Sequence, residues 1–110
     1  MARIEIETLL YRLGITSNYY GYRLLLTVLD VAFDDPDKLV RVNRLFREVA
    51  ELYDISPTSV RDNIETLIIV SWRKNPNLIQ NITGYPLVSR PPVKRFLEIA
   101  INYLIRTSRT

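Results

Sequence analysis

The chain has 110 residues, 47% of them apolar and 25% charged, which suits one globular domain with a buried core. It contains no cysteine and no histidine, so disulfides, thiolate metal sites and the Ser-His-Asp and Cys-His kinds of catalysis are excluded. Its net charge is +3, with a balance of +4 in residues 76–110 that suits a polyanionic partner, although a solvated surface accounts for it equally well. We therefore expect a binding protein with no metal and no cofactor, and not an enzyme.

The spacing of the apolar residues predicts an all-α fold of about six helices. In chain order, helices are expected at residues 4–13, 19–33, 43–53, 57–74, 78–82 and 93–105, with a short helical segment at 38–42. Gly14 should end the first helix, and Ser17 or Asn18 should cap the second. The Asn75-Pro76-Asn77 segment should break the chain, and residues 86–89 form the only stretch that could be extended.

Residues 43–74 carry the pattern of a helix-turn-helix motif. Ala50 is a small residue where two crossing helices would touch, and Asp54 follows at the turn, where a left-handed backbone is needed. Ile55 would plug the turn. Ser56 can cap the second helix, and Pro57 suits its first position. An ordinary antiparallel helix pair is the alternative.

A helical wheel of residues 57–74 separates an inner face from an outer one. The inner face collects Val60, Ile64, Leu67, Ile68 and Ser71. Polar residues concentrate in the first half of the outer face and its flanks, as reading the DNA major groove requires. The DNA-binding candidates there are Ser56, Thr58, Ser59, Arg61, Asp62, Glu65 and Thr66, with Arg73, Lys74, Arg90, Lys94 and Arg95 as flanking cations for phosphates.

Residues along nearly the whole chain fit one known family at its spacing. They are Leu13-Gly14-Ile15, Gly21-Tyr22, Leu45-x-x-x-Val49-Ala50, Val60, Ile64, Trp72, Ile82-x-Gly84-Tyr85, Pro91 or Pro92, and Phe96. In this order they resemble the C-terminal DNA-binding domain of the stage-zero sporulation response regulator of spore-forming Firmicutes. The resemblance implies a six-helix domain that binds a short DNA box, often in tandem copies. We expect one domain over residues 1–110 without the family's receiver domain. The chain is either a stand-alone relative or an excised domain, and a match that follows directly on Met1 favours the former.

The recognition helix departs from that family. The family offers a glutamate followed by arginines that reach bases, whereas this chain has Arg61, Asp62 and Glu65 at those positions. Arg61 could still read guanine, and either acid could accept from cytosine N4. Carboxylates near phosphates repel, however, so we expect a different sequence preference and weaker binding.

Two functions remain open at this point. The first is a transcriptional regulator that reads a short site in double-stranded DNA with the helix starting at Pro57, and that pairs as a homodimer on tandem sites. The alternative is a protein-interaction module of the same fold that has lost specific DNA binding and modulates RNA polymerase or another regulator. Ile69, Tyr19 and Tyr20 would offer it an exposed apolar surface. Acids within the first residues exclude a signal peptide, and no apolar run reaches the roughly 18 residues of a membrane span, so the expected location is cytoplasmic and no membrane partner is expected.

Overall fold

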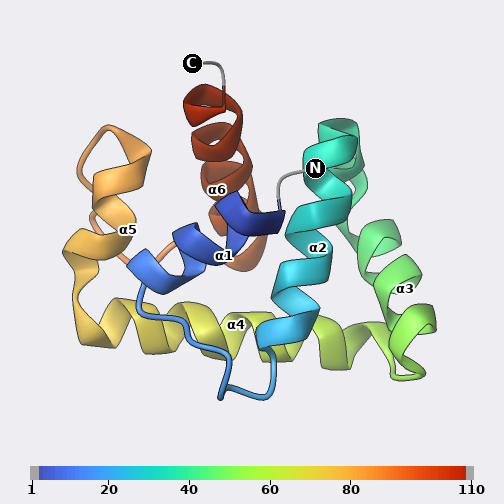
Figure 1. The fold of residues 1–110 in the computed structure, drawn as a ribbon. Coiled ribbons are helices and arrows are strands. Elements are labelled where there is room, and N and C mark those ends of the chain that lie inside the picture. Colours follow the sequence, from blue (N-terminus) through green and yellow to red (C-terminus); the bar gives the residue numbers. More distant parts are fainter. Residues whose placement is uncertain (1–2, 109–110) are drawn as a thin grey trace.

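A computed structural model describes residues 3–108 and confirms the all-α fold, since none of these residues lies in a strand. Within residues 3–108, six α-helices and one 3₁₀ segment follow each other along the chain (Figure 1). They are α1 (Arg3–Arg12), α2 (Tyr22–Asp34), η1 (Pro36–Arg41), α3 (Val42–Tyr53), α4 (Pro57–Lys74), α5 (Pro76–Thr83) and α6 (Val93–Thr107).

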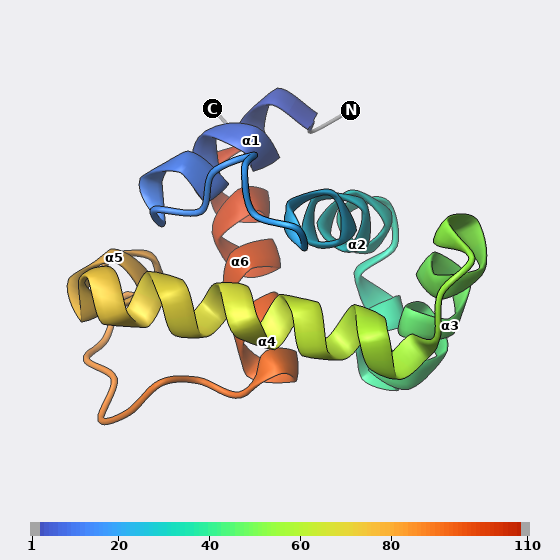
Figure 2. The same cartoon turned by 90° about the horizontal axis from the view of Figure 1, so that it is seen from below.

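The longest helix, α4, runs along one side of the molecule. It crosses below α2 and α6, with α3 at its N-terminal end and α5 at its C-terminal end (Figure 1). In the view from below, no other element is drawn in front of α4 (Figure 2). The fold therefore presents this helix at its surface while packing it against α2, α3, α5 and α6.

The core is a single apolar cluster to which all six helices contribute. Phe96 of α6, Leu25 of α2 and Ile64 of α4 are fully buried in it. Burial of a side chain of this size stabilises the fold by about 1.5–3 kcal/mol, so the inner face of α4 is anchored by several such contributions. The predicted inner residues of α4 are confirmed, because Val60, Ile64, Leu67, Ile68 and Ser71 are its buried residues.

The predicted start of the second helix is wrong. Helix α2 begins at Tyr22 rather than Tyr19, its N-cap is Gly21, and neither Ser17 nor Asn18 caps it. The backbone N–H of Tyr19 donates to the carbonyl of Thr16 at 3.2 Å, in a turn rather than a helix. The Asn18 side chain accepts a hydrogen bond from the Thr16 hydroxyl instead of from a backbone N–H of α2. The segment before Tyr22 thus forms a turn, and its last residue, Gly21, lies against Asn63 of α4.

Two smaller helix boundaries also differ from the sequence prediction. The predicted break is present, since α4 ends at Lys74, but α5 begins at Pro76 rather than at residue 78. Asn75 caps α5 and accepts from the backbone N–H of Asn77 at 2.9 Å. The short segment near residue 38 is a 3₁₀ helix that starts at Pro36. Proline suits this first position, because a backbone N–H here would have no hydrogen-bond partner within the helix. Residues 88 and 89 form a bend and residues 86 and 87 have no regular structure, so the one stretch that could have been extended is not a strand. The predicted end of the first helix at Gly14, with its φ of 76°, is confirmed.

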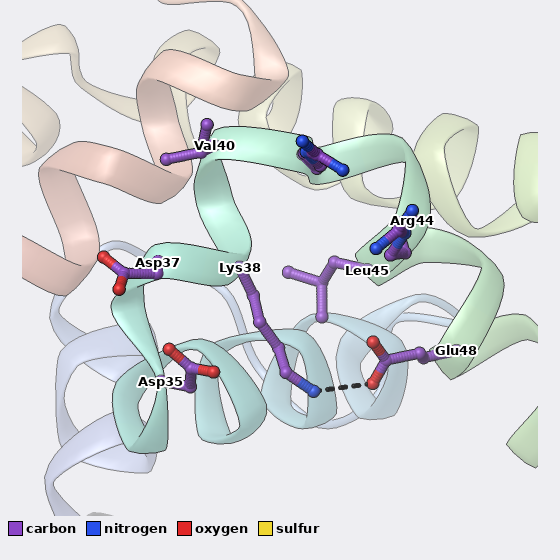
Figure 3. Close-up of a pocket in the computed structure, with 8 residues that line it drawn as sticks. Asp35, Asp37, Lys38, Val40, Arg44, Leu45 and Glu48 are labelled. Atoms are coloured by element: carbon purple, nitrogen blue, oxygen red, sulfur yellow. Dashed lines mark hydrogen bonds and ion pairs between the residues drawn. The ribbon is translucent and has the colours of Figure 1, made fainter.

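One ion pair fixes η1 against α3. The Lys38 amine lies 2.8 Å from a Glu48 carboxylate oxygen, as the dashed line in Figure 3 shows. This hydrogen bond raises the pKa of Lys38 above its ordinary value. A raised lysine pKa means that the pair's contribution to stability is complete at neutral pH and is lost only in strong alkali.

We predict that Ser71→Ala stabilises the domain. The Ser71 hydroxyl is buried on the inner face of α4 and has no hydrogen-bond partner among the described residues. An unpartnered buried hydroxyl costs about 1–3 kcal/mol, and alanine is also the better helix former. Thermal or urea unfolding should therefore show a gain of about 1 kcal/mol.

Ser56→Ala is the matched control. It also removes a serine hydroxyl, from α4's N-cap, but this hydroxyl accepts a hydrogen bond from the backbone N–H of Ser59, whereas that of Ser71 has no partner within residues 3–108. This variant should destabilise the domain by about 1 kcal/mol. A loss of stability in Ser71→Ala would contradict the assignment of an unpartnered hydroxyl.

Candidate nucleic-acid interface

The turn between α3 and α4 has the geometry that the sequence predicts. Asp54 has φ 54° and ψ 47°, and it is the one non-glycine residue with positive φ in residues 3–108. The backbone N–H of Ile55 reaches back to the carbonyl of Ala50 at 3.1 Å, which closes the end of α3. Ala50 itself is buried, so the two helices can cross closely. An aspartate accepts this left-handed conformation at lower cost than a β-branched or bulky residue would.

Helix α4 starts as its sequence predicts. The Ser56 side chain accepts a hydrogen bond from the backbone N–H of Ser59 at 3.0 Å, and Pro57 follows at the first helical position. This cap satisfies one of the N–H groups at the helix start that have no partner within the helix. The remaining ones point out of the N-terminal end of α4, where an anion is attracted.

The outer face of α4's first half is polar and open. Thr58, Arg61, Asp62 and Thr66 are exposed, and Ser59 is partly exposed. Thr66 and the neighbouring Asn63 also form side-chain hydrogen bonds to the backbone of the helix. The Thr66 hydroxyl donates to the carbonyl of Asp62 at 3.0 Å, and the Asn63 amide donates to the carbonyl of Ser59 at 2.8 Å.

A network of ion pairs centres on Glu65. Its carboxylate lies 3.3 Å from the Arg61 guanidinium on the same helix and 3.9 Å from the guanidinium of Arg90, which comes from the loop between α5 and α6. Arg61 also lies 3.6 Å from Asp62. The structure thus brings together four of the predicted site residues, and their charges sum to zero.

Sequence reasoning missed two residues of this face. Asn43 and Arg47 on α3 line a hollow of about 270 Å³ together with Thr58 and Arg61. The first helix of a helix-turn-helix crosses the DNA backbone, so cations at this place can meet phosphate. The signal was present in the sequence, because Arg47 lies outside the buried stripe of α3, which includes Phe46 and Val49. Arg47 forms no ion pair with any residue from 3 to 108.

Residues 6–106 match the family described as sporulation initiation factor Spo0A C terminal. The chain belongs to this family. Members of the family are DNA-binding effector domains of a transcription factor, and the family is not one of enzymes. The resemblance found in the sequence is confirmed, and it extends over the whole core and both helices of the helix-turn-helix.

Lys74 lies far from the Spo0A-type recognition face. It is the last residue of α4, about 20 Å along the helix from Arg61. Its amine donates to the carbonyl of Gly14 at 2.6 Å and lies 5.4 Å from the centre of the Tyr19 ring. Lys74 therefore ties the segment after α1 to α4, which sequence spacing could not indicate because 60 residues separate the two partners.

The two predicted cations of α6 stand apart from the Glu65 network. The guanidinium of Arg95 donates to the Tyr85 hydroxyl and lies 3.5 Å from Glu98. The hydrogen bond to Tyr85 raises the pKa of Arg95. Lys94 is exposed and has no ion pair with the described residues. Of the flanking cations, the structure thus brings Arg90 alone into ion-pair contact with α4's polar face.

A larger hollow of about 470 Å³ lies between η1 and α3 (Figure 3). It is lined by both signs of charge, with Asp35, Asp37 and Glu48 among the acids and Lys38 and Arg44 among the cations. Lys38 extends to Glu48 rather than to the two aspartates (Figure 3). Among residues 3–108 no acidic cluster has the geometry of a metal site, and no helix is long and apolar enough to cross a membrane.

We predict that Lys74→Met destabilises the domain by about 1 kcal/mol, because it removes a charged hydrogen bond and a cation–π contact. Arg73→Met is the control, since Arg73 is the neighbouring exposed cation and makes no hydrogen bond or ion pair with a described residue. Thermal unfolding of both variants measures the difference. Equal stabilities would show that Lys74 does not hold the segment in place.

Proposed function

We propose that this domain is a transcriptional regulator that reads a short site in double-stranded DNA by placing the first half of α4 in the major groove. The observation that carries the proposal is the open polar face of α4, which the Asp54 turn and the buried inner face hold at the surface. A major groove about 12 Å wide admits an α-helix presented in this way. A regulator of this kind works in the cytoplasm, where the bacterial chromosome lies.

The residues of this face have distinct roles in the proposal. Arg61 reads guanine through two hydrogen bonds, and Asp62 or Glu65 accepts from cytosine N4. The N–H groups at the start of α4, with the hydroxyls of Ser56 and Thr58, meet a phosphate. Arg47 and Arg90 meet phosphates on either side of the helix. The remaining predicted contacts are Ser59 and Thr66 to bases, and Lys94 and Arg95 to more distant phosphates.

Glu65 sets the balance between specific and non-specific binding. In the free protein its carboxylate forms ion pairs with both Arg61 and Arg90. Bound DNA must therefore replace these ion pairs with contacts from its phosphates or bases. Random DNA offers phosphates to the arginines but leaves the Glu65 carboxylate facing negative charge. A site with a cytosine beside its guanine offers a donor to Glu65 as well. We therefore expect low affinity for random duplexes and a preference that differs from that of family members with arginines at these positions.

Arg61→Ala tests direct reading of a base. It should cost about 1–3 kcal/mol on the preferred site and relax the preference at one base position. Selection from a random library, followed by titration of the selected duplex and its single-base variants, measures both effects. A loss that is equal on every sequence would mean that Arg61 contacts phosphate only.

Glu65→Gln tests whether the Glu65 carboxylate competes with DNA for Arg61 and Arg90. This variant keeps the shape of the side chain and frees two arginines, so it should bind a random duplex about two- to fivefold more tightly, as expected for an exposed ion pair. Glu48→Gln is the control, since Glu48 pairs with Lys38 between η1 and α3 and the proposal gives neither residue a DNA contact. Unchanged affinity in Glu65→Gln would place this face away from DNA.

The first experiment is a fluorescence-anisotropy titration of a random duplex at two salt concentrations. Binding that weakens with salt would support a DNA-facing cationic surface, because released counterions give this dependence. No binding at low salt, and none in library selection, would refute the proposal. The fold would then serve the alternative function, a module that binds a regulator or polymerase.

Two further parts of the proposal rest on family membership and not on geometry. We propose that two copies bind tandem sites as a homodimer, and that the bound domain contacts RNA polymerase. Sedimentation of the protein with duplexes that carry one site or two tests the first part. Independent binding to the two sites would refute it.

A further inference from the structure

The loop between α1 and α2, residues 13–21, is attached to one side of α4 at two points. Near its start, Lys74 holds the carbonyl of Gly14 at 2.6 Å. At its end, Gly21 lies against Asn63, so closely that a Cβ on Gly21 would come within 3.0 Å of the Asn63 carbonyl oxygen. Asn63 and Lys74 are about 16 Å apart along the helix, so the loop follows α4 over much of its length.

This loop and the α5–α6 loop, residues 84–92, lie on opposite sides of α4. Figure 2 shows the helix running between them, and Figure 1 shows the tip of the α1–α2 loop descending past α4 on its open side. A helix in the major groove has one phosphate backbone on each side. The loops are thus placed where the two backbones would pass.

The tip of the α1–α2 loop carries uncharged hydrogen-bond donors. Ser17 and Asn18 are exposed, and Tyr20 is 78% exposed, whereas Tyr19 is partly buried against the core. Between Arg12 and Arg23 the chain contains no acidic residue that would repel a phosphate. Arg23, at the start of α2, shares a hollow of about 430 Å³ with Ser17, Asn18 and Tyr20.

We infer that the α1–α2 loop is a second DNA contact, in which the Tyr20 hydroxyl and the Arg23 guanidinium hold a backbone phosphate beside the groove that α4 occupies. This inference rests on the proposed function. Hydroxyl, amide and guanidinium donors are the groups that protein–DNA interfaces use on phosphates. Arg3 and Glu7, which also line the hollow, have opposite charges and leave Arg23 as its net cation.

The attachment to α4 explains how such a loop can act in register with the recognition helix. Since Lys74 and Gly21 fix both ends of the loop to α4, its tip keeps a constant position relative to the groove. A docking surface for a protein would be built from apolar side chains, whereas Tyr20 is the one large hydrophobic residue that is mainly exposed in residues 13–21. The tip thus has the polar character of a phosphate contact.

Tyr20→Phe and Arg23→Gln test the inference on the full chain with the duplex that library selection yields. Each should weaken binding about threefold to tenfold on preferred and random sequences alike, because phosphates carry no sequence information. Arg23→Gln should also reduce the slope of log K against log salt by about 0.9. Tyr11→Phe and Arg12→Gln are matched controls on α1, where Tyr11 is 75% exposed and Arg12 contacts Tyr103 of α6.

A scan of the duplex with single neutral methylphosphonates locates the contact. One substituted phosphate outside the bases read by α4 should weaken the wild type, and this effect should vanish in Tyr20→Phe and Arg23→Gln but persist in both controls. Unchanged affinity and an unchanged scan in the two loop variants, while the wild type binds, would overturn the inference and leave the proposed function intact. A wild type that binds no duplex would refute the proposed function itself.

Discussion

The packing of one long helix is the constraint on which the rest of this structure depends. Helix α4 buries Val60, Ile64, Leu67, Ile68 and Ser71 against four other helices, and this burial fixes its rotation about its own axis. A rotation of α4 would expose several of these side chains at a cost of about 1.5–3 kcal/mol each. The outer polar face is therefore held rigid, as a surface that reads DNA must be. The Asp54 turn and the Ser56 cap set where this face begins.

The charges of that face oppose the function that the fold supports. A helix-turn-helix gains most of its affinity from cations near phosphates, yet here Arg61 and Arg90 are paired with Glu65. Each pair is half exposed, so each is weak, and DNA can exchange them at little cost. In the proposed function, the exchange would leave a carboxylate that only certain bases satisfy, so the same arrangement would lower non-specific affinity and raise selectivity. The proposed loop contact would add phosphate affinity without changing that selectivity.

Local signals in the sequence were sufficient for the helices and the turn. The 3.6-residue spacing of apolar side chains, Gly14 at a helix end, Asp54 at the turn and Ser56-Pro57 at a helix start act within a few residues, so neighbouring residues alone indicate the structure. The two failures have different causes. Tyr19 to Gly21 have helical spacing but lie in a turn, where Gly21 packs against Asn63, which lies 42 positions later in the chain. The predicted break between α4 and α5 is present, but the local cap by Asn75 lets α5 begin at Pro76, two residues before the predicted start.

The sequence by itself determined the fold class, the helix-turn-helix, the inner face of α4 and the family, because each depends on local periodicity or on residues in a fixed order. The tertiary structure alone decided which side chains of different elements meet. It joined Arg90 to Glu65, assigned Lys74 to a structural contact with Gly14, and added Asn43 and Arg47 to the candidate interface. These contacts connect different elements, and the separation of two residues along a chain does not fix the distance between their side chains after the helices have packed.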